Sequence, residues 1–442
     1  MKHLDLSIEI LNSIYDDDVS FAEALRNMFQ NNPDLRPLRA DVAGLVGCEL
    51  RHHLLFTYLS KNLEEFTAAD KRVLALGLAN DYFFRHFPAP EMDEAVREKL
   101  GEEKWEAAAP LYAVVGRPDE YIPVAIPRNS NTYLSLRYNT PEWLLKIFQH
   151  FGYGATYKTL RAFAKPHVTT LRATPEVDED DLGEDFLPTV TPDVYAYKGK
   201  IAIRKHLAYR DSRLFDERVG VKALIDAHKI EDPATLLLYS GAEQMDWERE
   251  ILETYGGSID LNIAVPDVDK KLPVTRAIRA KDLHNVNFYS APDPLHMDAA
   301  ITRPCDLVIC APKSTNFNDI PTVPDFILHF NKDEMDGLFA AEKEALEGCA
   351  KYVAVNGKLI YAVYTISKKE GQLTVSSFLR EHGEFTLEQE RQILPFEKEG
   401  VALYYAVLRK GEKVLALGTP LEDIPSLSSP APVSSSAAES AE

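Results

Sequence analysis

Short apolar runs alternate with helical stretches through the second half of this 442-residue chain, and no other feature restricts its fold as strongly. Such alternation is typical of a doubly wound sheet, in which helices cover strands that are mostly parallel. We therefore expect an α/β domain from about residue 226 to 415, with a trailing antiparallel strand near Ala402 to Leu408. The runs read A-T-L-L-L-Y, I-D-L-N-I-A-V, V-N-F-Y, D-L-V-I-C, K-L-I-Y-A-V-Y and A-L-Y-Y-A-V-L.

Residues 1–137 have a different pattern. Apolar residues recur there at three- and four-residue spacing, as in L-S-I-E-I-L-N-S-I and V-L-A-L-G-L-A-N-D-Y-F-F, which predicts amphipathic helices. Strand-like alternation is nearly absent, and prolines divide the stretch into short segments. The first part of the chain is therefore expected to be an all-helical domain.

Residues 138–225 are predicted to form a small α+β subdomain. A helix is expected in T-P-E-W-L-L-K-I-F-Q-H-F, with Thr140 as its cap and Pro141 in its first turn. Extended segments are expected around V-T-T-L-R-A-T and Y-A-Y-K-G-K-I-A-I. The end of the chain, residues 416–442, is rich in serine, alanine and proline and is expected to be a disordered tail.

The charge of the chain limits its interactions with nucleic acid. A formal net charge of -20 argues against non-specific coating of nucleic acid, although it leaves room for a local basic face. An acidic run from Asp178 to Asp185 is expected to be a solvated loop.

No long apolar run and no signal peptide are recognised, so a cytoplasmic protein without membrane contact is expected. The four scattered cysteines suggest buried apolar side chains and indicate no metal site.

Several segments resemble, in order and spacing, the RsmB/Sun family of S-adenosylmethionine-dependent rRNA cytosine-5 methyltransferases. The resemblance spans roughly residues 139–409. It implies a NusB-like helical domain with a surface for a protein partner, a small RNA-binding subdomain and a Rossmann-like class I methyltransferase domain. The matching segments are N-T-P-E-W-L-L-K-I-F, V-P-D-F-I-L-H-F-N-K-D-E-M, A-A-E-K-E-A-L, N-G-K-L-I-Y-A-V-Y-T-I and F-L-R-E-H.

Both cysteines on which the chemistry of that family depends are replaced. The nucleophile of S-T-C-T corresponds to Tyr364, and a phenol with a pKa of about 10 is only about a thousandth ionised at neutral pH. The second cysteine, in D-A-P-C-S, corresponds to Lys313, with Cys310 at the position of the aspartate. Two interpretations stay open at each position: Cys310 is a relocated nucleophile or a buried strand end, and Lys313 is a general base or an ordinary surface charge.

The expected cofactor loop has also changed. The family pattern D-x-C-A-A-P-G-G-K-T corresponds here to the segment L-Y-S-G-A-E-Q-M-D-W, in which Gln244 and Met245 replace the glycines. Glycines in such a loop let the backbone approach a ligand closely. Only Gly241 and Ala242 are small, and Asp246 replaces the lysine. Binding of S-adenosylmethionine is therefore doubtful.

Three further positions belong to the expected cofactor site. The acid that would bind the ribose corresponds to Pro266, with Asp267 one position later, and an alternative register restores Asp267 to this role. Near the adenine, Asp293 is either a ligand contact or a turn residue. Pro312 is retained from the D-A-P-C-S motif.

Basic residues gather in and after the bridge. Interleaved with Tyr195, Tyr197 and Tyr209, they suggest a surface that neutralises phosphates and stacks on bases. The alternative is ordinary surface charge on a hairpin and a helix. The residues are Arg161, Lys165, His167 and Arg172, followed by Lys198, Lys200, Arg204, Lys205, His206, Arg210 and Arg213.

Three functions stay open on this evidence from the sequence. The first is a pseudoenzyme that binds rRNA or another structured RNA. The second is an active methyltransferase that uses S-adenosylmethionine in a rebuilt pocket. The third is a scaffold for other proteins without a role in RNA binding.

Overall fold

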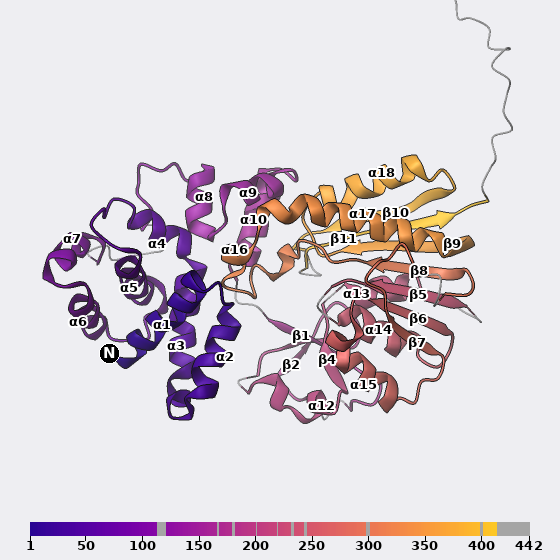
Figure 1. Ribbon diagram of the computed structural model, residues 1–442, viewed down its shortest axis with the longest axis horizontal. Coiled ribbons are helices and arrows are strands. Elements are labelled where there is room, and N and C mark those ends of the chain that lie inside the picture. Colours follow the sequence, from indigo (N-terminus) through magenta and orange to yellow (C-terminus); the bar gives the residue numbers. More distant parts are fainter. Residues whose placement is uncertain are drawn as a thin grey trace, which may run out of the picture.

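The computed structural model describes residues 1–112, 121–165, 168–178, 182–199, 201–218, 220–230, 234–242, 245–297, 301–397 and 401–412. Within these residues, a helical part and an α/β part lie side by side along the long axis of the molecule (Figure 1). The predicted tail, residues 416–442, lies outside the described residues.

The helical part is built from amphipathic helices with few strong caps. In α1 the buried positions include Leu4, Ile10 and Ile14, as the periodicity predicts. A capping box between Thr67 and Asp70 starts α5. The helices are α1 (Lys2–Asp16), α2 (Phe21–Asn31), α3 (Arg39–Arg51), α4 (His53–Leu59), α5 (Ala68–Ala79), α6 (Ala89–Leu100), α7 (Glu102–Tyr112) and α8 (Asn131–Tyr138).

The bridge that follows consists of α9 (Glu142–Gln149) and α10 (Tyr153–Phe163). Asn139 has a left-handed backbone conformation, and its side-chain amide bonds the backbone of Leu54 and of Leu50, both at 2.9 Å. Because asparagine tolerates this conformation, it suits the junction. The prediction of Thr140 as helix cap is wrong: Pro141 occupies the cap position, and the Thr140 hydroxyl donates to the Tyr138 carbonyl instead.

A four-stranded antiparallel sheet with the order β2-β3-β1-β4 forms the small α+β region. It confirms the extended segment around V-T-T-L-R-A-T. The second predicted segment is partly wrong, because the chain leaves β3 at Tyr197 and forms a 3-10 turn at Ile203–Lys205. The elements are β1 (Thr169–Ala173), β2 (Phe186–Pro188), β3 (Val194–Tyr197), α12 (Leu207–Arg210) and β4 (Leu214–Asp216).

The large sheet has seven strands in the order β10-β11-β9-β8-β5-β6-β7. Strands β5 to β9 pair in parallel and β11 is antiparallel to β9, which confirms the expected Rossmann-like methyltransferase fold with its trailing antiparallel strand. The strands are β5 (Thr235–Ser240), β6 (Asp260–Val265), β7 (Val286–Ser290), β8 (Cys305–Ala311), β9 (Val353–Val363), β10 (Phe385–Ile393) and β11 (Leu403–Lys410).

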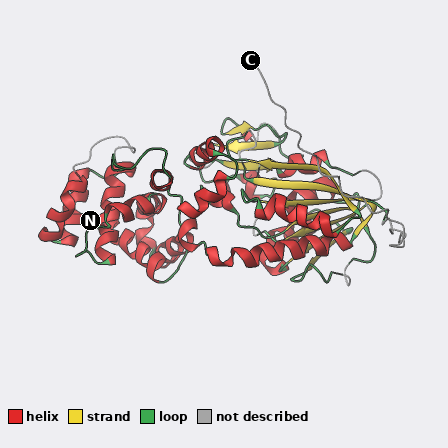
Figure 2. Ribbon diagram, turned by 90° about the horizontal axis from the view of Figure 1, so that it is seen from above, coloured by secondary structure: helices red, strands yellow, loops and turns green. Residues whose placement is uncertain are grey.

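Helices cover both faces of this sheet (Figure 2). All six residues of β5 are buried, as expected for a central parallel strand. Among the described residues, no helix is long and apolar enough to cross a membrane. The covering helices are α13 (Val221–Ala227), α14 (Asp246–Tyr255) and α15 (Leu272–Ala280) on one face, and α17 (Met335–Lys351) and α18 (Thr374–Glu381) on the other, with α16 (Phe326–His329) toward the helical part.

Candidate functional site

The carboxyl ends of the parallel strands bring most of the predicted site residues to one edge of the sheet, where ligands bind in folds of this kind. Gly241 follows β5, Asp267 follows β6 and Asp293 follows β7. Pro312 and Lys313 follow β8, and Tyr364 follows β9. The contacts of each residue determine whether this edge of the sheet can bind a cofactor or act on a substrate.

Tyr364 is a buried structural residue in this arrangement. Its hydroxyl donates a 2.5 Å hydrogen bond to Oδ2 of Asp246, which is 3% exposed at the start of α14. The guanidinium of Arg218 lies 4.2 Å from the centre of the phenol ring. Burial, and then the Asp246 charge, raise the pKa of Tyr364 well above its ordinary value, so the phenol is held neutral.

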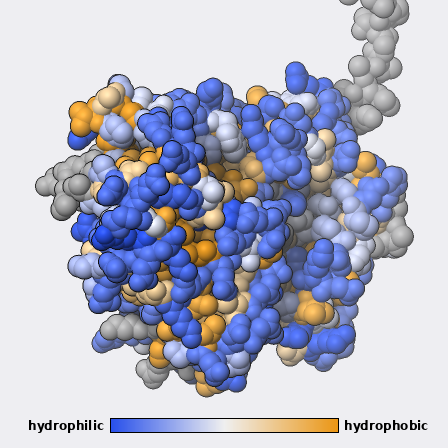
Figure 3. Space-filling view, turned by 60° about the vertical axis from the view of Figure 1, so that its left-hand side comes forward, coloured by the Kyte–Doolittle hydropathy of each residue, from blue (hydrophilic) through white to orange (hydrophobic). Residues whose placement is uncertain are grey.

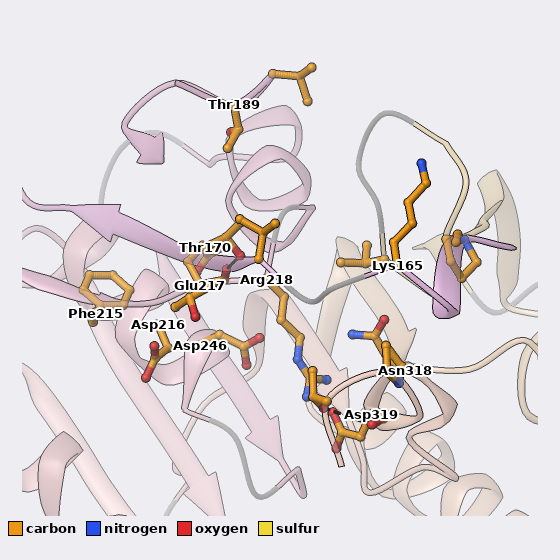
Figure 4. A pocket seen from close by; sticks show the side chains of 18 of the residues that line it. Lys165, Thr170, Thr189, Phe215, Asp216, Glu217, Arg218, Asp246, Asn318 and Asp319 are labelled. Carbon is orange, nitrogen blue, oxygen red and sulfur yellow. Dashed lines mark hydrogen bonds and ion pairs between the residues drawn. The ribbon is translucent and has the colours of Figure 1, made fainter. Parts of the chain in front are cut away.

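The Arg218 guanidinium, which lies over the Tyr364 ring, is held in place by two hydrogen bonds. It donates to Oδ1 of Asn316 at 3.0 Å and to Oδ1 of Asp319 at 2.7 Å. Figure 4 shows the Arg218 side chain extended toward Asp319, with Asp246 and Glu217 nearby. A residue between β4 and α13 is thereby joined to the loop that follows β8.

A buried carboxylate joins the loops after β8 and β9. Glu370 accepts from the backbone and the hydroxyl of Thr315 at 2.6 and 2.8 Å, and it also accepts from the hydroxyl of Thr365. The Ser314 hydroxyl donates to the Tyr364 carbonyl at 3.4 Å. The two loops that carry the replaced cysteine positions are thus held together by hydrogen bonds.

Gly241 packs against the protein's own backbone. Its amide donates to the Ala311 carbonyl at 2.9 Å, and a Cβ built on it would lie 2.6 Å from the backbone nitrogen of Lys313. Pro312, which is buried, lines the same contact. The absence of a side chain at Gly241 is therefore explained by the approach of the loop after β8.

Lys271 is buried next to the loop after β5. Its ammonium lies 2.6 Å from the carbonyl oxygen of Ala242 and 2.9 Å from Oε1 of Glu248. Burial raises the pKa of Glu248, although Lys271 opposes this shift. The lysine therefore ties the end of the β6 segment to the loop and to α14.

The two candidate cofactor acids make local contacts. Asp267 is partly exposed and accepts from the backbone nitrogen of Asp269 at 3.0 Å, as a cap of the following 3-10 turn. Asp293 accepts from the backbone nitrogen of Leu295 at 2.8 Å and pairs with Nδ1 of His296 at 2.7 Å. The hydrogen bond from His296 lowers the pKa of Asp293.

The other two candidate reactive residues, Cys310 and Lys313, differ in solvent exposure. Cys310 is fully buried on the face of β8 that packs against α17. Burial, with Cys349 as neighbour, raises the pKa of the Cys310 thiol well above its ordinary value, which opposes thiolate formation. Lys313 is exposed and has no ion pair with another described residue.

A large cleft opens beside this edge, between the small sheet, α10 and the α/β part. Its volume is about 1490 Å³, and Asp246 and Arg218 lie in its wall. Figure 4 shows Lys165 on the opposite side of the opening from Asp216 and Glu217. Tyr209 and Ser212 place the end of α12 at its border.

Three cations line the α10 side of the cleft. Lys158, Arg161 and Lys165 follow one another at three- and four-residue intervals, are exposed, and form no ion pair with another described residue. Sequence inspection missed Lys158, although its spacing from Arg161 was the available signal. It also missed Arg218, whose role depends on contacts distant in sequence.

The other predicted RNA-binding residues lie in different environments. Arg172 is 7% exposed, and its guanidinium pairs with Glu250 at 3.1 Å and with Asp193 at 3.4 Å. The expectation that Arg172 lies on an open basic surface is therefore wrong. Arg204, Lys205 and Arg210 are exposed on the 3-10 turn and α12, whereas His167 and Lys200 lie outside the described residues.

Two of the three tyrosines expected to stack on bases are tied to the protein. The hydroxyl of Tyr197 donates to the Ile201 carbonyl and that of Tyr209 donates to Asp216, both at 2.7 Å. Tyr195 is partly buried against the core of the small sheet. Among the described residues, no group of three or more metal-binding side chains is suitably placed to hold a metal ion.

No family model matches the sequence. The chain is 25% identical over 119 residues to ribosomal RNA small subunit methyltransferase B of Xanthomonas campestris pv. campestris. The matched stretch covers 24% of this chain and only 27% of that relative.

Solved structures match over more of the chain. The structure of PH0851 has a TM-score of 0.71 at 16% identity and covers 92% of this chain and 98% of its own. A methyltransferase homolog from Pyrococcus horikoshii has a TM-score of 0.52 at 12% identity, over 63% of this chain and 97% of its own. NSun6 from Pyrococcus horikoshii, solved with SFG, has a TM-score of 0.53 at 10% identity, over 61% and 98%.

The fold, with its loops at the carboxyl ends of the parallel strands, defines the class: a Rossmann-like α/β domain of the methyltransferase type, preceded by a helical domain. Within that class, the 119-residue match to ribosomal RNA small subunit methyltransferase B agrees with the resemblance of the sequence motifs to the RsmB/Sun family. Because identities to the solved structures are low, they establish the fold alone.

Proposed function

We propose that this chain binds structured RNA, with rRNA as the first candidate, and that it does not methylate cytosine. The observation that carries the second half of this proposal is the buried hydrogen bond between Tyr364 and Asp246. A residue at the nucleophile's position must be ionisable and reach the base. The phenol of Tyr364 is neutral, 3% exposed and bonded to another side chain.

The remaining reactive groups do not supply a substitute. Cys310 lies on the opposite face of β8 from Ala311, within the core shared with Cys349, so it is not exposed to the cleft. Lys313 is exposed and forms no ion pair with another described residue, so no described side chain assists it in proton transfer. None of the three residues Tyr364, Cys310 and Lys313 is therefore placed to attack a cytosine ring as a nucleophile.

The described residues also do not fit S-adenosylmethionine in the arrangement that the family uses. The space beside Gly241 is taken by the backbone of Pro312 and Lys313. Asp267 caps its own turn, and Asp293 is engaged by His296. We propose that affinity for this cofactor is weak or absent.

RNA binding is supported by the cleft and its cations. A volume of about 1490 Å³ accommodates more than one nucleotide, and Lys158, Arg161 and Lys165 on one wall are free to pair with phosphates. The curated relative that matches part of the chain is named for ribosomal RNA methylation. On the face seen in Figure 3, apolar surface is broken into separate patches by hydrophilic side chains, which gives less support to a protein scaffold.

Charge reversal on α10 tests the RNA half of the proposal. Arg161→Glu should weaken binding to an rRNA fragment and reduce its salt dependence, because one phosphate contact is lost. Arg380→Glu is the matched control, since Arg380 is also an exposed arginine in the last turn of a helix. Equal binding by the two variants in fluorescence anisotropy would exclude the α10 wall as an RNA site.

Calorimetric titration tests the cofactor half. No heat of binding is expected when S-adenosylmethionine is added to the intact protein. Micromolar affinity would instead favour an active methyltransferase with a rebuilt pocket and would return Asp267 and Asp293 to consideration as cofactor ligands.

A further inference from the structure

We infer that Phe396 is a stacking site for one unpaired RNA base in the cleft, with Lys158 beside it to receive the phosphate of that nucleotide. This inference rests on the proposed RNA binding and specifies its ligand as single-stranded rather than fully paired RNA. Nothing in the family resemblance assigns a role to either residue.

Phe396 is presented to the cleft by a tight turn between β10 and β11. The backbone nitrogen of Glu397 donates to the Leu394 carbonyl at 2.9 Å, with Pro395 in the position of the turn that favours proline. The Glu397 carboxylate accepts from the backbone of Leu394 at 2.8 Å and from Arg391 at 3.2 Å. The turn is therefore fixed before any ligand arrives.

The phenylalanine at this turn lacks a structural reason for its position. Phe396 is 36% exposed and lines the cleft, whereas most phenyl rings of this chain are buried or partly buried in a core. An exposed aromatic ring costs solvation free energy, and an aromatic platform for bases is a common use of such a ring in single-strand binding.

Lys158 gives the platform its electrostatic partner. Its ammonium lies 5.4 Å from the ring centre, within the range of a cation–π interaction. Lys158 belongs to α10 and Phe396 to the α/β part, so the two sides of the cleft meet at this pair. Arg161 and Lys165 line the same side of the cleft as Lys158.

Unpaired RNA fits this arrangement better than a duplex does. Base faces are covered by their neighbours in a helix, so a single protruding ring can stack only on a base that has left the stack. A duplex would meet the cations through its phosphates but would leave Phe396 in water.

The chain contains a matched control pair. Lys369 lies 5.1 Å from the ring centre of Phe339, which is partly exposed on α17 and does not line the cleft. Phe339→Ala therefore removes a phenylalanine with a lysine beside its ring from a site away from the cleft, where the ring is partly buried against the core.

The experiment uses the full chain and a single-stranded rRNA fragment that carries 2-aminopurine, with the same sequence as a duplex for comparison. Phe396→Ala should weaken single-strand binding by about tenfold, because the stacking contact with one base is lost. It should also abolish the quenching of 2-aminopurine and leave the salt dependence unchanged. Phe396→Trp should restore both signals, and duplex binding should not change.

The outcomes separate this inference from the proposal on which it rests. If Phe396→Ala and Phe339→Ala bind the single strand equally while Arg161→Glu binds it more weakly, stacking at Phe396 is excluded and RNA binding stands. If Arg161→Glu also has no effect, the α10 wall is excluded as an RNA site and the proposed RNA binding loses its main support. Thermal melting of each variant verifies that the fold is retained.

Discussion

The hydroxyl of Tyr364 donates a 2.5 Å hydrogen bond to Asp246, and this bond joins the end of β9 to the start of α14. By resemblance, the first residue stands at the nucleophile's position and the second at the end of the cofactor loop. Two positions that serve separate steps in a methyltransferase are here partners in one buried contact. Their changes are therefore best explained together.

Removal of this hydroxyl should destabilise the protein. Tyr364→Phe leaves Oδ2 of Asp246 buried without its donor, and an unsatisfied buried group costs about 1–3 kcal/mol in the free energy of unfolding. Urea denaturation measures the loss. Tyr153→Phe, at a tyrosine that is 50% exposed, should change it by less than about 0.5 kcal/mol. A Tyr364→Phe protein as stable as the natural one would contradict the role assigned to the bond.

Restored thiols should not restore catalysis. A Tyr364→Cys, Lys313→Cys double variant has both cysteines of the family, but it lacks the aspartate at the position of Cys310 and the glycines of the cofactor loop. We expect no tritium transfer from labelled S-adenosylmethionine to RNA, by this variant or by the natural protein. Transfer by the natural protein that Cys310→Ser abolishes would contradict the pseudoenzyme proposal and identify a relocated nucleophile.

The strands β5, β6, β8, β9 and β11 were predictable because each is an apolar run that is largely buried, whereas the run V-N-F-Y forms β7 without a fully buried residue. β10 was missed because, apart from Phe385 and Ile393 at its ends, it is largely exposed and its sequence F-T-L-E-Q-E-R-Q-I carries charged residues on both sides. The small sheet was predicted only in part, since the chain after Tyr197 turns away despite its apolar residues.

The site was less predictable, because its contacts join residues far apart in sequence. That Tyr364 is a poor nucleophile followed from its chemistry, but its bond to Asp246, 118 residues away, did not. Arg172 was assigned to a basic surface because it follows other basic residues in the sequence, and the buried Glu250 that pairs with it lies 78 residues further on. Charge alone does not indicate whether an arginine faces water or a carboxylate.

Arg172 should therefore affect stability, with a dependence on pH. Burial raises the pKa of Glu250 from 4.5 to about 7, although Arg172 opposes the shift. The contribution of protonated Glu250 to stability is fully present below pH 4.5 and is lost as the pH rises through about 7. Arg172→Met removes the charge that compensates ionised Glu250, so the variant should lose about 3–5 kcal/mol at pH 8 and less at pH 5.5. Urea denaturation at both pH values measures this, and exposed Arg204→Met should show no such difference.

Charge reversal at the 3-10 turn tests a second part of the RNA surface. Arg204 and Lys205 are exposed beside α12, whose end borders the cleft. Arg204→Glu, Lys205→Glu should weaken binding to an rRNA fragment and flatten its salt dependence. If anisotropy titrations give the affinity of the natural protein, the RNA contact is confined to the α10 side.

A last prediction concerns Glu342 on α17, a fully buried side chain beside the buried Glu370. Burial, and then the charge of Glu370, raise the pKa of Glu342 well above its ordinary value, which favours the protonated form of this carboxyl. Because the pKa of Glu342 is higher in the folded state than in the unfolded state, its stabilising contribution is fully present below the ordinary pKa of glutamate and falls as the pH rises toward the folded value.

Glu342→Gln, which mimics the protonated acid, should therefore flatten the decline of the unfolding free energy between pH 5.5 and 8, and it should be at least as stable as the natural protein at pH 8. Glu344→Gln is the matched control, because Glu344 is exposed on the same helix and its variant should follow the natural profile within about 0.5 kcal/mol. Urea denaturation across this range decides the matter: a Glu342→Gln protein that is less stable than the natural one at pH 8 would mean that Glu342 is ionised in the fold.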